Sequence, residues 1–305
     1  MPDLSGAVSG KANMLRVYFG HHKCASQYIK AIFLRATALL GMTPSRVDYL
    51  AADLPLGQHT REPFITLLAE HRVRLLHDPA VVWCLTNGDN EAITLLEQRG
   101  DYRGFHVIRD PRDVLVSAYF SHRYSHPIGS EGGWIAEFRR QLSAAPNIET
   151  GLLLELDFLA RIFASMDAWN YANPRVYETR FETLIADPVT EFRRIFNFLG
   201  IATPRLGLTT LPGLLLDRER KLRAGRPMPQ RTTLPLPLLQ LMVERNDFMH
   251  RAGGRQPGQE DERHHYRKGV AGDWRNHFTP RVADAFRDRY GQVLIRLGYE
   301  RSRDW

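Results

Sequence analysis

Cysteine is scarce in this chain of 305 residues. Only Cys24 and Cys84 occur, which is too few for a disulfide framework, and they lack the spacing of a metal-binding pair. Long apolar stretches are also missing, because no run approaches the roughly eighteen residues that mark a membrane span. The first fourteen residues are polar and small, without a signal-peptide core. These absences predict a cytoplasmic, soluble chain with no membrane span and a flexible N-terminus over 1–14.

Basic residues outnumber acidic ones but are not concentrated. The chain has 41 Lys and Arg, 34 Asp and Glu and a net charge of +7, which suits an anionic ligand, nucleic acid or an acidic membrane surface. No five consecutive residues are basic, so we expect no nucleic acid partner. His122 and His126 are four residues apart without the His-Glu-x-x-His pattern, and adjacent histidines at 21–22 and 264–265 point apart on a strand. We therefore expect no metal.

Short apolar runs alternate with amphipathic segments. The expected strands are 15–20, 73–76, 80–85, 104–108 and 174–180. The expected helices are 25–40, 90–99, 111–124, 151–170, 188–199, 236–250 and 280–298. Such alternation indicates an α/β fold, a central parallel sheet flanked by helices. Residues 125–150, with three glycines and two prolines, read as a loop, and no clear linker divides 15–305 into separate domains.

The loop 20–27 connects the first strand to the first helix. Backbone amides at a helix N-terminus point toward an anion, and the helix dipole favours negative charge there. Lys23 adds a full charge, Ser26 and Gln27 add side-chain donors, and the small Ala25 lets a phosphate approach. The loop is P-loop-like, although the Walker pattern Gly-x-x-x-x-Gly-Lys-Ser/Thr is absent. The alternative is an ordinary turn with a surface lysine.

A second anion site is indicated at 109–117. Arg109 lies at the carboxyl end of a strand, where open α/β sheets bind ligands, and its planar guanidinium suits a phosphate. Ser117 could add a hydroxyl donor. Asp110 and Asp113 are interpreted as helix caps, Asp113 in a capping box.

A third feature is the loop 267–279. Arg267 and Lys268 are followed by Gly269, as in a loop that wraps around an anion. The alternative is a solvated basic turn.

Taken together, these segments resemble the cytosolic-type sulfotransferases, which use 3′-phosphoadenosine 5′-phosphosulfate (PAPS). The family's Pro-Lys-Ser-Gly-Thr-Thr-Trp-like loop corresponds to 22–28, and its Arg-Asp/Asn-Pro-x-Asp-x-x-Val-Ser stretch to 109–117. Its Arg-Lys-Gly-x-x-Gly-Asp-Trp-Lys-Asn-x-Phe-Thr loop recurs at 267–279 with one Lys replaced by Arg275, and its Arg-Tyr-Glu-Asp-Leu-x-x-Asp-Pro stretch corresponds to 180–188. The resemblance spans about 15–300 and implies a sulfotransferase domain over 15–305.

The resemblance also implies roles for individual residues. Those implied for binding PAPS are Lys23, Cys24, Ala25, Ser26 and Gln27 at the 5′-phosphosulfate, Tyr28 and Phe181 at the base, Arg109 and Ser117 at the 3′-phosphate, and Arg267, Lys268 and Gly269 in the third loop. Cys24 and Gln27 depart from the family's Ser and Thr, which removes two hydroxyl donors.

In-line sulfuryl transfer is the reaction that the resemblance implies. Lys23 would stabilise charge on the leaving oxygen, and a general base would accept the acceptor's proton. The family's base is the histidine of a Lys-Thr-His stretch, but this chain has Asn87 there, which cannot act as a base. Asp89, His122 and His77 are the possible replacements.

The acceptor is not encoded in a recognisable motif. We expect a small molecule with a hydroxyl or amine, in a pocket lined by parts of 43–66, 124–150 and 205–250; a homodimer is possible. Two other functions stay open: a nucleotide-dependent phosphotransferase, which would need a Walker lysine loop, and a non-catalytic protein that binds PAPS or another polyanion.

Overall fold

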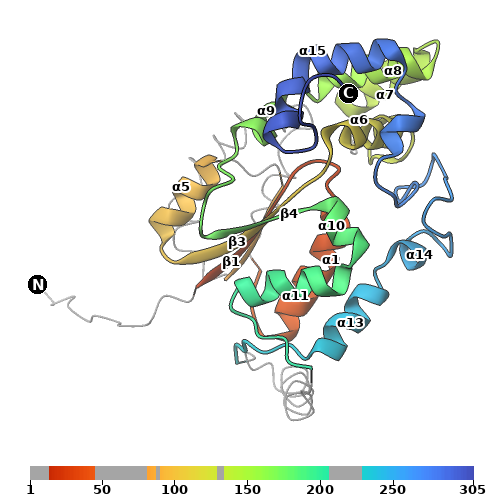
Figure 1. Ribbon diagram of the computed structural model, residues 1–305. Coiled ribbons are helices and arrows are strands. Elements are labelled where there is room, and N and C mark those ends of the chain that lie inside the picture. Colours follow the sequence, from red (N-terminus) through yellow and green to blue (C-terminus); the bar gives the residue numbers. More distant parts are fainter. Residues whose placement is uncertain (1–13, 45–80, 87–89, 129–133, 206–228) are drawn as a thin grey trace, which may run out of the picture.

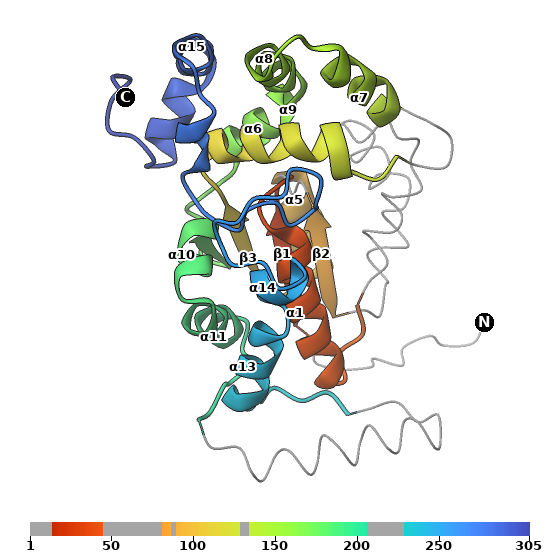
Figure 2. The same cartoon turned by 90° about the vertical axis from the view of Figure 1, so that its right-hand side faces the viewer.

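The computed structural model describes residues 14–44, 81–86, 90–128, 134–205 and 229–305. Its described strands form a parallel sheet in the order β2-β1-β3-β4 (Figure 1 and Figure 2). They are β1 (Leu15–Gly20), β2 (Val82–Thr86), β3 (Tyr102–Ile108) and β4 (Val176–Arg180). The α/β class with a central parallel sheet is confirmed, while the strand predicted at 73–76 lies outside the described residues.

Helices cover both faces of the sheet. Tyr18 and Phe105 face a core shared with α1 (Ser26–Leu39), α11 (Pro188–Phe198) and α13 (Leu236–Glu244). Val17 and Phe19 face the opposite side, where they pack with α5 (Asn90–Arg99) and Trp169. Adjacent residues of β1 therefore serve different cores, as the period of two in a strand requires.

A further group of helices lies beyond the carboxyl ends of the strands (Figure 1 and Figure 2). It comprises α6 (Pro111–Phe120), α7 (Trp134–Ala144), α8 (Ile148–Phe158), α9 (Ala160–Ala168) and α15 (Pro280–Arg296). A buried apolar cluster that includes Val116, Leu152 and Phe286 joins all five. These helices therefore lie next to the carboxyl ends of the strands, where the two predicted anion loops begin.

Several predicted boundaries are wrong. The region 125–150 is not a loop, since it contains α7 and the start of α8, whose N-cap Asn147 accepts a hydrogen bond from the Thr150 amide. The helix predicted over 111–124 changes at Phe120 into a π-helical segment, η1 (Ser121–Ser125).

Other predicted helices are divided. Residues 151–170 belong to α8 and α9, and 236–250 to α13 and α14 (Phe248–Arg251), which Asp247 caps. A short helix, α10 (Phe181–Ala186), was missed after β4. The polar cap Asp247 starts α14 where apolar periodicity alone looks continuous, whereas α9 begins after Leu159 without a side-chain cap.

Candidate functional site

The candidate site lies between β1 and β3, at the point where the connections after these two strands run to opposite sides of the sheet. The strand that follows β1 in sequence, β2, lies on one side of the β1–β3 pair. The strand that follows β3, β4, lies on the other side. Such a switch between neighbouring parallel strands opens a crevice at their carboxyl ends, which is where ligands bind in open α/β sheets. Lys23 follows β1 and Arg109 follows β3, so both cations reach this crevice.

The loop between β1 and α1 has an unusual backbone. Lys23 and Ala25 have φ angles of 62° and 60°, in the left-handed region that residues other than glycine rarely adopt. Ala25 is the N-cap of α1, and no side chain caps the helix. The first amides of α1 are therefore not bonded by a capping side chain, and this arrangement suits an anion.

Cys24 differs from its neighbours in this loop. Its side chain is fully buried and packs into the helical core beyond the sheet. Burial raises the pKa of the Cys24 thiol to about 12, so the thiol stays protonated. The thiol donates to the His22 carbonyl at 3.8 Å, so the backbone of Cys24, and not its side chain, is the part that could contribute to an anion site.

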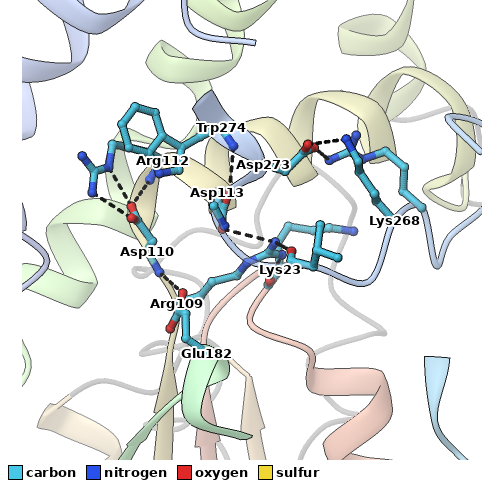
Figure 3. Close-up of polar contacts among 12 residues, drawn as sticks. Lys23, Arg109, Asp110, Arg112, Asp113, Glu182, Lys268, Asp273 and Trp274 are labelled. Carbon is cyan, nitrogen blue, oxygen red and sulfur yellow. Dashed lines mark hydrogen bonds and ion pairs between the residues drawn. The ribbon is translucent and has the colours of Figure 1, made fainter. Parts of the chain in front are cut away.

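Lys23 and Arg109 lie close together beyond the carboxyl ends of β1 and β3 (Figure 3). Arg109 donates from Nη1 to the Lys23 carbonyl at 3.3 Å and from Nη2 to the Val270 carbonyl at 3.4 Å. Burial, and then the Arg109 charge, lower the pKa of Lys23 to about 8, with Glu155 acting in the opposite direction. The positive charges of Lys23 and Arg109 repel each other, and a bound anion would relieve the repulsion.

Arg109 itself is incompletely paired. Its guanidinium lies over the Phe181 ring, 4.3 Å from the centroid, and 3.8 Å from the Asp113 carboxylate. Its Nε is buried and has no hydrogen-bond partner within the described parts of the chain. A buried donor without a partner is costly, so this atom indicates a missing acceptor.

The two aspartates of 109–117 have different roles. Asp110 caps α6 as predicted, accepting from the Arg112 amide at 2.9 Å. The capping-box prediction for Asp113 is wrong: its carboxylate accepts from the amides of Gly272 at 2.6 Å and Trp274 at 2.9 Å (Figure 3). The loop 267–279 reaches the start of α6 and supplies two amides, which outcompete the helix's own N-terminal groups.

The cations of this third loop are paired with carboxylates. Arg267 bonds Glu260 and Asp273, and the Lys268 ammonium lies 2.5 Å from Asp273. Burial alone would raise the pKa of Asp273, but hydrogen bonds, first from His277 and then from Lys268, hold it well below its usual range. Gly269 has a φ of 69°, and a Cβ there would lie 2.3 Å from the Phe248 ring. The loop is therefore held in a defined shape around these pairs.

A cluster of histidines lies beside Lys23. The His22 and His122 rings stack at 5.0 Å, and His126 lies 5.8 Å from His22 and 5.2 Å from His122 between centroids. Nδ1 of His122 lies 2.8 Å from Oε1 of Glu155, which is fully buried. Burial raises the pKa of Glu155, although His122 and Lys23 oppose the rise. A buried carboxylate thus orients the His122 ring from behind.

A second polar chain holds the start of the loop. Nε2 of His21 lies 2.9 Å from Nε2 of His106, whose Nδ1 lies 2.7 Å from the Glu178 carboxyl. Trp169 donates to the other Glu178 oxygen at 2.7 Å. Burial lowers the pKa of His106 to about 3 and raises that of Glu178 to about 8. We infer that protonated Glu178 donates to neutral His106, which donates in turn to His21.

Replacing Glu178 with glutamine is expected to be tolerated near neutral pH and to stabilise the fold in alkali. Because folding raises the Glu178 pKa, its stabilising contribution is present below its ordinary value and is lost as pH rises toward about 8. A glutamine amide can donate to His106 without titrating. Urea unfolding at about pH 5 and pH 8 checks this, with exposed Glu137→Gln as the control. A variant that loses as much stability as wild type between the two pH values would contradict it.

The remaining predicted residues that the structure describes lie on α1 and α6. Ser26 and Gln27 begin α1, and the half-buried Tyr28 packs edge-on against Phe192. Ser117 is half-buried in α6, one turn after Asp113. Asp89, Asn87 and His77 lie outside the described residues, so of the three base candidates His122 is the one the structure places.

Sequence reasoning missed Glu155. Its signal is a single acidic residue within the apolar run of α8, Gly-Leu-Leu-Leu-Glu-Leu. A charged residue that faces the buried side of a helix needs a partner, and His122 supplies it. The grouping of His22 with His122 and His126 was also missed, because adjacent and i,i+4 histidines were considered separately.

Known proteins match this chain in sequence. A family model described as the sulfotransferase domain matches residues 100–298. Sulfotransferase 1C2 of Rattus norvegicus is 25% identical over 192 residues, which are 62% of this chain and 53% of that protein. Sulfotransferase 1C2 of Homo sapiens is 23% identical over 191 residues, with the same coverages of 62% and 53%. The chain spans about half the length of these curated relatives.

Among solved structures, mouse sulfotransferase SULT7A1 complexed with PAP is 16% identical, with 92% of this chain and 84% of that chain covered and a TM-score of 0.48. No described helix is both long and apolar enough to cross a membrane. The family match covers more than half of the chain and includes the second and third loops, so this chain belongs to the sulfotransferase domain family.

Proposed function

We propose that the protein transfers a sulfuryl group from PAPS to a hydroxyl or amine of a small-molecule acceptor. The observation that carries the proposal is the pairing of Lys23 with Arg109 across the switch point, with the buried Nε of Arg109 lacking an acceptor. Two cations on separate loops suit a donor with two separated phosphates. Family membership supplies the chemistry.

In this proposal Lys23 acts on the leaving group. The acceptor oxygen or nitrogen attacks sulfur, the bond from sulfur to the bridging oxygen of the nucleotide breaks, and 3′-phosphoadenosine 5′-phosphate (PAP) leaves. Negative charge builds on that bridging oxygen. An ammonium placed beside it in a site that excludes water stabilises the transition state. The first amides of α1 and the hydroxyl of Ser26 would hold the 5′-phosphate.

Arg109 would hold the 3′-phosphate with Ser117, and Phe181 supports Arg109 from below. His122 is the proposed general base. With Nδ1 bonded to Glu155, Nε2 is the nitrogen that would accept the acceptor's proton. Glu155 would stabilise the imidazolium that forms, as a carboxylate does behind a catalytic histidine. Glu155 acts through His122 and is a positioning residue.

The competing functions are less well supported. The loop 20–27 lacks the Walker pattern that a phosphotransferase of that class requires. A non-catalytic binder would have no need for a histidine oriented by a buried carboxylate, and His122 with Glu155 favours catalysis.

Incubation with donor labelled on sulfur tests the proposal against a panel of phenols, alcohols and amines. We expect labelled acceptor and PAP to form in equal amounts, with PAP also acting as a product inhibitor. Tight PAP binding without turnover on any acceptor would instead support the binder. Transfer of phosphate from a nucleoside triphosphate would support the phosphotransferase.

Replacing Asp113 with alanine is expected to weaken PAP binding at least about tenfold, because the loop 267–279 loses hydrogen bonds to a charged acceptor worth about 1.5–3 kcal/mol each. Calorimetric titration with PAP measures the change. The control is Asp284→Ala, which removes an exposed carboxylate on α15 that pairs with Arg287. Unchanged PAP affinity in Asp113→Ala would show that the loop does not depend on this carboxylate.

A further inference from the structure

The three histidines beside Lys23 form a compact set of potential metal ligands. His22, His122 and His126 each offer one ring nitrogen, and these three nitrogens lie within 4.8 Å of one another. They come from two parts of the chain, the loop after β1 and the π-helical segment η1 with the residue after it. The fold, and not local sequence spacing, brings them together.

Their rings have the separations expected around one ion. Zinc–nitrogen bonds of 2.0–2.1 Å in a tetrahedral site place imidazole centroids about 5 Å apart. The observed centroid separations are 5.0, 5.2 and 5.8 Å. Neighbouring nitrogens of a tetrahedral site with these bond lengths lie about 3.3 Å apart. Binding of an ion would therefore require the rings to rotate and bring together the three nitrogens, which now lie within 4.8 Å of one another.

In two of these rings, the nitrogen that would face away from the ion has the kind of partner that metal-binding histidines usually have. A ligating histidine usually donates its other ring N–H to a carboxylate or a backbone carbonyl, and this fixes the ring orientation. Nδ1 of His122 lies 2.8 Å from buried Glu155, and Nδ1 of His126 lies 3.1 Å from the Pro127 carbonyl. In both rings Nε2 is then the nitrogen that would bind an ion.

We propose that His22, His122 and His126 bind one divalent cation of the zinc class, with a fourth position left open. Three imidazoles without a carboxylate ligand favour zinc, copper, nickel or cobalt over magnesium or calcium. Lys23 opposes the ion by charge repulsion, and the Glu155 carboxylate offsets that repulsion.

The ion would compete with the proton for one atom. A metal bound at Nε2 of His122 occupies the lone pair that the proposed base needs, so bound zinc is expected to inhibit sulfuryl transfer reversibly. This consequence rests on the proposed function, whereas binding of the ion does not.

A second group in the described chain, Glu260 with Asp273 and His277, is a weaker candidate. Its two carboxylates already bond Arg267 and Lys268. An ion there would have to displace Arg267 and Lys268 from these two carboxylates.

Titration of tag-free protein with Co²⁺ tests the site directly. We expect one ion per chain, with the intense visible absorption of a four-coordinate cobalt centre, and displacement by Zn²⁺. His126→Asn and His22→Asn should abolish the signal, and Glu155→Gln should weaken cobalt affinity by about 10- to 100-fold. His250→Asn is the matched control, because this exposed histidine pairs with Asp247 outside the cluster. PAP affinity monitors the fold of each variant.

Two outcomes would overturn the site: no four-coordinate cobalt signal in wild type, or an equal signal in His126→Asn. Activity gives an independent readout. Zinc should inhibit wild type and lose its effect in the presence of a chelator. Cobalt binding in a protein that transfers no sulfuryl group to any acceptor would keep the metal site and remove the proposed function.

Discussion

Replacing Lys23 with methionine is expected to lower kcat for sulfuryl transfer by about 10²- to 10³-fold, the usual effect of removing one group that stabilises developing negative charge. Methionine matches the length and apolar stem of lysine, so the variant removes the ammonium with little change in volume. Lys23 is half-buried beside Arg109 and next to the start of α1. Steady-state kinetics with saturating donor measures the effect.

The control for this prediction is Lys30→Met, which removes another half-buried lysine further along α1. It should keep kcat within about twofold of wild type, as expected of a substitution that touches no reacting atom. PAP affinity in Lys23→Met should fall much less than kcat, because Arg109 and the backbone amides remain. A Lys23→Met enzyme that turns over at the wild-type rate would remove the proposed mechanism.

Local sequence was sufficient to predict that two candidate anion loops lie at the same edge of the sheet. Lys23 and Arg109 each follow an apolar run that is a strand, and the carboxyl ends of parallel strands meet at one edge. The strand order was not needed for this inference. It nevertheless explains why the two loops meet, because β1 and β3 are neighbours in the sheet although β2 lies between them in sequence.

Contacts between distant segments could not be predicted. Asp113 looked like a capping residue because the amides it accepts from belong to residues 159 and 161 positions away. Glu155 looked like an outlier in an apolar helix, because its partner His122 lies on another helical segment. Hydrophobic periodicity indicates which face of a helix is buried, but it does not indicate which polar group from another segment packs against that face.

Replacing His122 with asparagine tests whether His122 is the general base or only a packed side chain. His122→Asn is expected to lower kcat by about 10²- to 10⁴-fold, the range for loss of a general base. The asparagine amide can take the place of Nδ1 and donate to Glu155, so the buried carboxylate keeps a partner. Nothing replaces Nε2. PAP affinity and the free energy of unfolding should therefore change little.

Glu155→Gln then tests the positioning role. Glutamine keeps the shape of Glu155 but carries no charge to stabilise the imidazolium, so kcat should fall while KM for the acceptor stays close to wild type. The fall should be smaller than in His122→Asn, and the double variant should be no slower than His122→Asn alone, because both changes act on one proton transfer. Additive losses would mean that Glu155 acts elsewhere, and wild-type kcat in His122→Asn would transfer the role of base to Asp89.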